Sequence, residues 1–172
     1  MKPKKMYIIG SLDDDMLAYF LEELNGNSSH SIQNITLFIE SNGGPIHILF
    51  GILDILNLYS CPVKTIGIGQ VCSAAATLLS AGTKGERYVT DMCMLVHHRP
   101  QSCGVSTEPD RAKRRLEYDM IAVEKHYEIL SQNIGHPVEK IKQDFSDELF
   151  LPNGEAIIKY GFADRLYRPE RS

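Results

Sequence analysis

The sequence has no excess of positive charge, no paired-cysteine motif and no long apolar run. Its formal net charge is −4 over 172 residues, whereas nucleic-acid-binding proteins owe much of their affinity to Lys and Arg that neutralise phosphates. The single basic run, residues 111–115, is interpreted as a solvated helix face. Nucleic acid is therefore not expected as a partner.

The apolar stretch nearest the N-terminus covers only residues 6–9, which is too short for a secretion signal or a membrane span. We therefore expect a cytoplasmic protein without a membrane partner. The cysteines lack C-x-x-C spacing, which predicts reduced, buried thiols and no metal site. They are Cys61, Cys72, Cys93 and Cys103.

Apolar, β-branched runs alternate with helix-length amphipathic segments, which predicts an α/β domain with parallel strands. Strands are expected at residues 6–10, 34–40 and 62–69, and helices at 11–26, 45–60 and 72–82. A length of 172 residues with 43% hydrophobic content predicts one domain, residues 1–172. Ser11 is expected to cap the first helix, and the acids 13–15 suit its positive end better than a metal site.

The second half of the sequence predicts short strands at 87–89 and 92–98, then one long helix. This helix, residues 108–134, stops at Gly135. Its narrow apolar stripe predicts packing against another helix, including one from a second subunit. The stripe consists of Leu116, Met120, Val123, Tyr127 and Leu130. Helices at 138–145 and 153–161 and a strand at 162–167 complete the chain.

Two adjacent glycines, Gly43 and Gly44, lie between a predicted strand and a predicted helix start. Backbone N–H groups in such a turn are open to approach, and a pair of them can hold an oxyanion. The alternative is that the glycines only form the turn.

Ser73 also follows a strand and begins a helix, so its hydroxyl and the N–H of Ala74 could face the same space as Gly44. This context is similar to that of nucleophilic serines, although the pattern G-x-S-x-G is absent. The alternative is a small residue that permits close helix packing.

A base for Ser73 could come from the strand that ends in His97 and His98. Successive side chains of a strand point to opposite faces, so only one of the two can face Ser73. The other is expected to be a structural or surface histidine. The remaining histidines are interpreted as structural; they are His30, His47, His126 and His136.

Five ordered motifs cover nearly the whole chain. They are SNGG, GQVCSAAATLLSAGTKGERYV, HRP, IGHPVEKIKQDFSDELFL and EAIIKYGFAD. On these motifs the sequence resembles the ClpP family of self-compartmentalised serine peptidases. The resemblance implies a ClpP/crotonase-like spiral of β-β-α units with a protruding handle helix, in a handle region of about 99–134.

The resemblance also implies an assembly and an activity. Members form two stacked seven-subunit rings, so a homo-oligomer or a hetero-oligomer with another ClpP is expected. The implied activity is that of a serine endopeptidase that cleaves unfolded polypeptides and peptides without a cofactor. Because only five residues precede the strand at 6–10, partnership with an AAA+ Clp unfoldase stays open.

By the same resemblance Ser73 is the nucleophile, His98 the base, and Gly44 and Ala74 the oxyanion-hole amides. The third member of the triad falls on Glu148, where the family has aspartate, and the adjacent Asp147 is the open alternative. Asn42 and Ala74 also differ from the family's Pro and Met.

Two rival functions are considered. One is a catalytically weak or inactive ring subunit that shapes a hetero-oligomeric Clp complex. It is favoured by the change of the triad acid and opposed by the retained Ser73 and His98. The other is a crotonase-type acyl-CoA enzyme, which needs no serine–histidine pair and has a longer chain.

Overall fold

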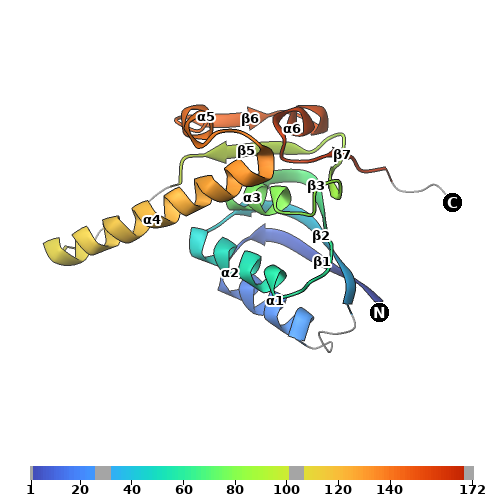
Figure 1. Cartoon of the computed structure of the whole chain (residues 1–172), viewed down its shortest axis with the longest axis horizontal. Coiled ribbons are helices and arrows are strands. Elements are labelled where there is room, and N and C mark those ends of the chain that lie inside the picture. The colour runs from blue at the N-terminus through green and yellow to red at the C-terminus, as the bar shows by residue number, and fades with distance from the viewer. Residues whose placement is uncertain (1, 26–31, 101–106, 169–172) are drawn as a thin grey trace.

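A computed structural model describes residues 2–25, 32–100 and 107–168 (Figure 1). Its elements are β1 (Lys2–Ser11), α1 (Asp14–Asn25), β2 (Ile32–Gly43), α2 (Ile46–Asn57), β3 (Val63–Cys72), α3 (Ala74–Ser80), β4 (Arg87–Val89), β5 (Met94–His98), α4 (Pro109–Ile134), α5 (Val138–Asp144), β6 (Glu148–Leu151), α6 (Gly154–Tyr160) and β7 (Arg165–Leu166). His30, Cys103 and positions 101–106 of the expected handle region lie outside the described residues.

The sheet confirms the predicted parallel α/β architecture. Its strands run in the order β1-β2-β3-β4-β7, and all these pairs are parallel. Strand β3 changes partner along its length, because residues 65–67 pair with β4 and residues 70–72 pair with β5. Gly69, with φ +59°, lies between the two paired segments. The carboxyl end of β3 is thereby directed toward β5.

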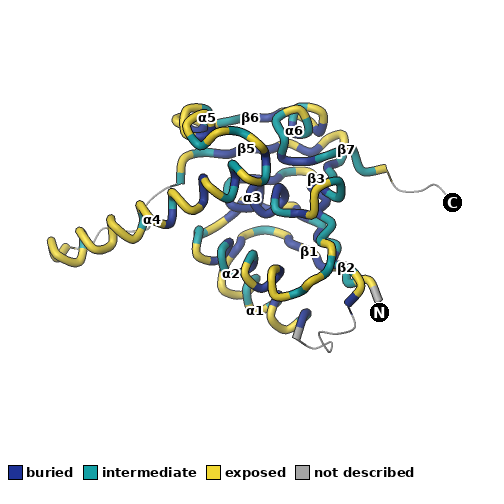
Figure 2. Tube along the Cα trace, in the orientation of Figure 1, coloured by how far each residue is buried: buried dark blue, intermediate teal, exposed yellow. Residues whose placement is uncertain are grey.

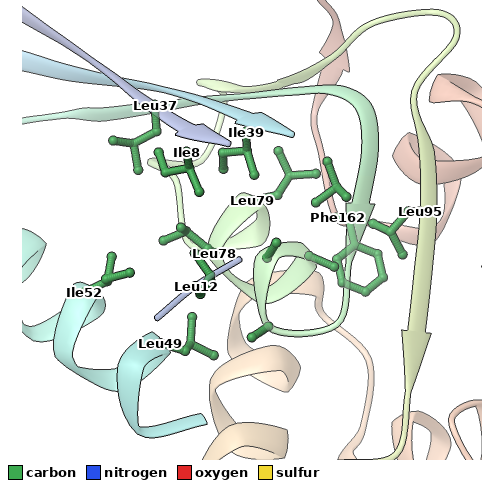
Figure 3. Packing of buried hydrophobic residues seen from close by; sticks show 14 of the residues in the cluster. Ile8, Leu12, Leu37, Ile39, Leu49, Ile52, Leu78, Leu79, Leu95 and Phe162 are labelled. Carbon is green, nitrogen blue, oxygen red and sulfur yellow. The ribbon is translucent and has the colours of Figure 1, made fainter. Parts of the chain in front are cut away.

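The core lies between the sheet and the helices α2 and α3 (Figure 3). Burial alternates along most of β2, as expected for a strand with one face on the core. Helix α3 is buried at every position from Ala74 to Ser80. Small residues at its start allow this close approach, so the helix that follows Ser73 is held firmly in the interior.

The predicted N-cap of the first helix is wrong. Ser11 is the last residue of β1 and pairs with Gly43 of β2. The N–H of Met16 instead donates to Asp13 Oδ1 at 3.0 Å, so Asp13 takes the capping role. Pairing with β2 extends the strand and moves the helix start two residues along.

Helix α4 confirms the predicted long helix, and its N-terminal half projects away from the body (Figures 1 and 2). The predicted stripe divides between two environments. Tyr127 and Leu130 are buried, whereas Leu116 and Met120 are 57% and 61% exposed. The C-terminal half packs on its own domain, and only the N-terminal half keeps an uncovered apolar surface.

One strand was not predicted. Residues Glu148–Leu151 form β6, which pairs antiparallel with β5. This pairing joins segments about fifty positions apart, so local periodicity carries no signal for it. No helix in the described part of the chain is long and apolar enough to cross a membrane.

Candidate active site

Ser73 has an unusual backbone conformation at the turn from β3 to α3. Its φ is 51° and its ψ −123°, and it is the only non-glycine residue with positive φ among the described residues. This conformation costs free energy in an L-amino acid and is concentrated at functional sites. It is the kind of sharp strand-to-helix turn that exposes a nucleophilic serine.

The strained turn is held by the neighbouring strand. The N–H of Ser73 donates to the carbonyl oxygen of Val96 on β5 at 2.8 Å. A serine before a helix usually spends its hydroxyl on a first-turn N–H, but here the side chain makes no capping hydrogen bond. The hydroxyl is left for other chemistry, and the side chain is only partly buried.

The glycine turn lies directly against Ser73. A Cβ atom added at Gly43 would lie 2.9 Å from Ser73 Cβ and 3.0 Å from the backbone nitrogen of Ala74. At Gly44 it would lie 2.0 Å from the carbonyl oxygen of Leu12. Any side chain at either position would displace backbone, so Gly43 is required for the close approach of β2 to the Ser73 turn, and Gly44 for the close approach to Leu12.

Two backbone N–H groups beside Ser73 are left as donors. Gly43 N–H is occupied, since it donates to Ser41 Oγ at 3.1 Å. Gly44 N–H makes no hydrogen bond with any described residue. Ala74 is the first residue of α3, so its N–H has no acceptor within the helix. Gly44 and Ala74 can therefore both donate to an oxyanion formed next to Ser73.

The side chain of Asn42 tethers the start of this turn. Gln70 Nε2 on β3 donates to Asn42 Oδ1 at 3.1 Å. The chain thus has a cross-strand hydrogen bond where the resemblance places a proline.

The two histidines of β5 face opposite ways, as predicted. His97 is 1% exposed and stacks on Phe145, with ring centroids 4.2 Å apart. His98 is half-buried and pairs with Glu148 on the antiparallel strand β6. Directly opposed residues of antiparallel strands project from the same face, so Glu148 shares a face with His98. Asp147 precedes β6 and has no position in that register.

No hydrogen bond joins the side chains of Ser73, His98 and Glu148 in the residues described. His98 Nδ1 instead lies 2.9 Å from the carbonyl oxygen of Arg99. Because a carbonyl only accepts, Nδ1 carries the hydrogen, and the lone pair of the neutral ring lies on Nε2. This is the tautomer that a base for the Ser73 hydroxyl requires.

Sequence analysis missed Thr77 and interpreted His126 only as structural. Thr77 Oγ1 lies 2.7 Å from His126 Nε2 and 3.3 Å from His97 Nε2. The available signals were a threonine in the apolar run of α3 and a histidine next to Tyr127 in α4. Neither indicates which partner it meets.

A separate cavity of about 570 Å³ lies between α2 and α4 and is lined by residues that include Phe50 and Ile129. Neither Ser73 nor His98 lines it. No group of three or more His, Cys, Asp or Glu residues is placed to hold a metal ion in the parts of the chain that the structure covers.

The fold and the site define an α/β protein in which a strained serine lies between two unoccupied backbone amides and a histidine-bearing strand. The chain belongs to the Clp protease family, whose sequence profile matches residues 1–170.

Two relatives show the degree of similarity. One is "ATP-dependent Clp protease proteolytic subunit 1" of Chlamydia felis, 37% identical over 135 residues, which are 78% of this chain and 65% of that protein. The other is "ATP-dependent Clp protease proteolytic subunit 2" of Chlamydia muridarum, 36% identical over 140 residues, 81% of this chain and 68% of that protein. For the first of them, the matched part is thus just under two thirds of the relative's length.

Proposed function

We propose that this chain is a serine endopeptidase subunit of a Clp protease, formed by one peptidase domain over residues 1–172. The conformation of Ser73 carries the proposal. Its φ of 51° is the only positive value at a described non-glycine residue. Such strain persists only where the surrounding structure holds it; here Val96 holds Ser73 by a hydrogen bond, and Gly43 leaves room for the turn.

The proposed reaction is acyl transfer. His98 Nε2 takes the Ser73 proton as Ser73 Oγ attacks the peptide carbonyl carbon, and the N–H groups of Gly44 and Ala74 stabilise the oxyanion. The protonated His98 then gives its proton to the leaving amine, and the peptide bond breaks. Water releases the acyl group by the reverse sequence, and Glu148 stabilises the imidazolium.

The proposed assembly is two stacked seven-subunit rings, with α4 as the handle between them. The rings contain copies of this chain, or this chain with another ClpP, and an AAA+ unfoldase supplies unfolded polypeptide in the cytoplasm. Support comes from the family, from the names of the relatives, and from the exposed apolar half of α4.

A second candidate is a catalytically weak or inactive ring subunit of a hetero-oligomeric Clp complex. One observation favours it: His98 Nδ1 faces the carbonyl oxygen of Arg99 at 2.9 Å. A neutral carbonyl stabilises an imidazolium less than a carboxylate does. With Glu148 unengaged, the base would lack the charge that drives proton transfer.

The test is labelling with a fluorophosphonate probe, read by mass spectrometry, together with cleavage of a fluorogenic peptide. The peptidase proposal predicts modification at Ser73 and loss of both signals in Ser73→Ala and His98→Ala. His136→Ala is the matched control and should keep both. An assembled wild-type protein that neither reacts with the probe nor cleaves peptide would establish the second candidate.

A further inference from the structure

Three buried polar side chains from three different elements meet behind the candidate active site. Thr77 on α3, His97 on β5 and His126 on α4 are 0%, 1% and 2% exposed. Aromatic rings surround them, and His97 lies between Phe145 and the ring of His126, at centroid distances of 4.2 and 5.4 Å. A buried polar cluster is costly unless its hydrogen bonds are made in one definite pattern.

The hydrogen positions in the cluster follow from its partners. Burial lowers the pKa of both histidines, that of His126 to about 4, so both rings are neutral near pH 7. His97 Nδ1 lies 3.1 Å from the carbonyl oxygen of His98, which can only accept, so Nδ1 carries the hydrogen of His97. His97 Nε2 then accepts from the hydroxyl of Thr77 at 3.3 Å.

The hydroxyl of Thr77 has a single hydrogen, and that hydrogen is committed to His97. The 2.7 Å contact with His126 therefore requires His126 Nε2–H to donate to Thr77 Oγ1. The remaining atom, His126 Nδ1, is buried and has no partner among the described residues, and in this pattern it is a bare lone pair. The hydrogen bonds therefore all run in one direction. His126 donates to Thr77, Thr77 donates to His97, and His97 donates to the carbonyl oxygen of His98.

Thr77 joins both halves of the proposed catalytic pair. Its N–H approaches the carbonyl oxygen of Ser73 at 3.4 Å. Its side chain forms a hydrogen bond with the His97 ring, which in turn donates to the carbonyl oxygen of His98. No other described residue forms a hydrogen bond with the Ser73 backbone through its own backbone and with the His97 ring through its side chain.

We propose that Thr77 is a positioning residue, whose hydroxyl sets the placement of His98 relative to Ser73 and links that placement to α4 through His126. This inference rests on the peptidase function proposed above. It adds a route by which the long helix acts on the active site.

The first test compares Thr77→Val, which keeps the shape and removes the hydroxyl, with Thr77→Ser, which keeps the hydroxyl. Thr77→Val is expected to lower kcat on a fluorogenic peptide roughly 10- to 100-fold with little change in KM. Thr77→Ser is expected to restore most of kcat. Ser80→Ala is the matched control, because Ser80 is a buried hydroxyl on the same helix that bonds Asn133 and the Thr77 carbonyl but neither histidine.

A kcat for Thr77→Val equal to that of wild type overturns the inference, as does an equal loss in Thr77→Ser and Thr77→Val. If the wild-type protein does not react with a fluorophosphonate, both the peptidase function and this inference are wrong. If the wild-type protein is active and Thr77→Val has the same kcat, only this inference is wrong.

Neutron diffraction on the wild-type protein tests the same inference without depending on whether the variants fold. Deuterium on His97 Nδ1 and His126 Nε2 supports the proposed chain of hydrogen bonds from His126 on α4 to the carbonyl oxygen of His98. Deuterium on His126 Nδ1 reverses the direction of the Thr77 hydroxyl and overturns it.

Discussion

Glu148 is one methylene longer than the aspartate that the resemblance to ClpP places in the triad. It lies opposite His98 in the β5–β6 register, whereas Asp147 precedes the strand. Adjacent residues in an extended segment face opposite sides, so only one of the two carboxylates can approach the imidazole. At the scale of single residues, this register favours Glu148 as the acid.

The corresponding prediction is that Glu148→Gln lowers kcat by roughly 10-fold or more, because in the proposed mechanism Glu148 supplies the negative charge that stabilises the imidazolium. Peptide-hydrolysis kinetics measure the effect. Asp147→Asn, one position away, should retain the wild-type rate. A larger loss in Asp147→Asn than in Glu148→Gln would assign the third position to Asp147.

Gly43 supports a second residue-scale prediction. Gly43 and Gly10 have the same φ of +85°, but only at Gly43 would a Cβ atom meet backbone within 4 Å. Gly43→Ala should therefore add displacement of the Ser73 turn to the backbone strain, which is about 1–2 kcal/mol at either site. Fluorophosphonate labelling should fall in Gly43→Ala and persist in Gly10→Ala. Equal labelling of the two variants would show that the contact is unimportant.

Asp164 supports a third prediction at the scale of single residues. It accepts from the backbone of Gly85 and from the backbone and guanidinium of Arg87, whose side chain is almost fully buried. Burial by itself raises the pKa of Asp164, but the bonds from Arg87 outweigh it and lower the pKa overall. The carboxylate thus compensates a buried cation.

Asp164→Ala should lower the free energy of unfolding by about 3–5 kcal/mol, since it leaves the Arg87 charge unpaired. Urea denaturation measures this. The control is Glu86→Gln, which breaks an exposed ion pair with Lys64 and should cost no more than about 1 kcal/mol. Similar losses in both variants would contradict the role assigned to the buried pair.

At the scale of elements, two histidines that are neutral in the folded protein join β5 and α4 to α3. They are His97 and His126, and both contact Thr77. Burial lowers the pKa of His126 from 6.5 to about 4 and that of His97 well below 6.5, with His126 adding to the effect on His97. Two further titratable groups face these histidines, His98 on β5 and Tyr127 on α4. The charged groups that act on Tyr127 are Arg99, Glu124 and Lys142.

The unfolded chain binds protons at both histidines below about pH 6.5, whereas in the folded chain His126 is protonated only near pH 4 and His97 only well below pH 6.5. The stabilisation is therefore complete above pH 6.5 and falls as the pH falls, by up to about 1.4 kcal/mol per pH unit for each histidine. Urea denaturation between pH 7 and pH 4 should show this slope, and His126→Leu should reduce it. Asp144 and Asp164 have lowered pKa values and titrate below this window. A slope unchanged in His126→Leu would contradict the assignment.

At the scale of the whole molecule, the projecting half of α4 presents Leu116, Met120 and Ile121, each more than half exposed. Burying a large apolar side chain is worth roughly 1.5–3 kcal/mol. The double substitution Leu116→Glu with Met120→Glu should therefore convert the assembly to smaller species in sedimentation velocity. Met92→Glu, at an 84% exposed turn position, should leave it intact. A wild-type chain that sediments as a monomer at all concentrations would remove the ring proposal.

Much of the site could be predicted because its parts are local. A glycine pair between strand and helix, a serine at a helix start, and two histidines that alternate along one strand are all patterns within a few residues. What could not be predicted is the contact between them. The strain at Ser73 depends on Gly43 and Val96, which come from other strands, and the bond from His98 Nδ1 to Arg99 depends on a rotamer.

The sequence by itself determined the alternation of strands and helices, the long helix at 109–134 and the opposite faces of His97 and His98, because periodicity of hydrophobic side chains is a local property. Only the tertiary structure decided three further features. These are the antiparallel register that sets Glu148 opposite His98, the division of the α4 stripe into buried and exposed halves, and the meeting of Thr77 with His97 and His126. The first and the third join residues about twenty to fifty positions apart. All three are fixed by the packing of the whole domain rather than by any local pattern.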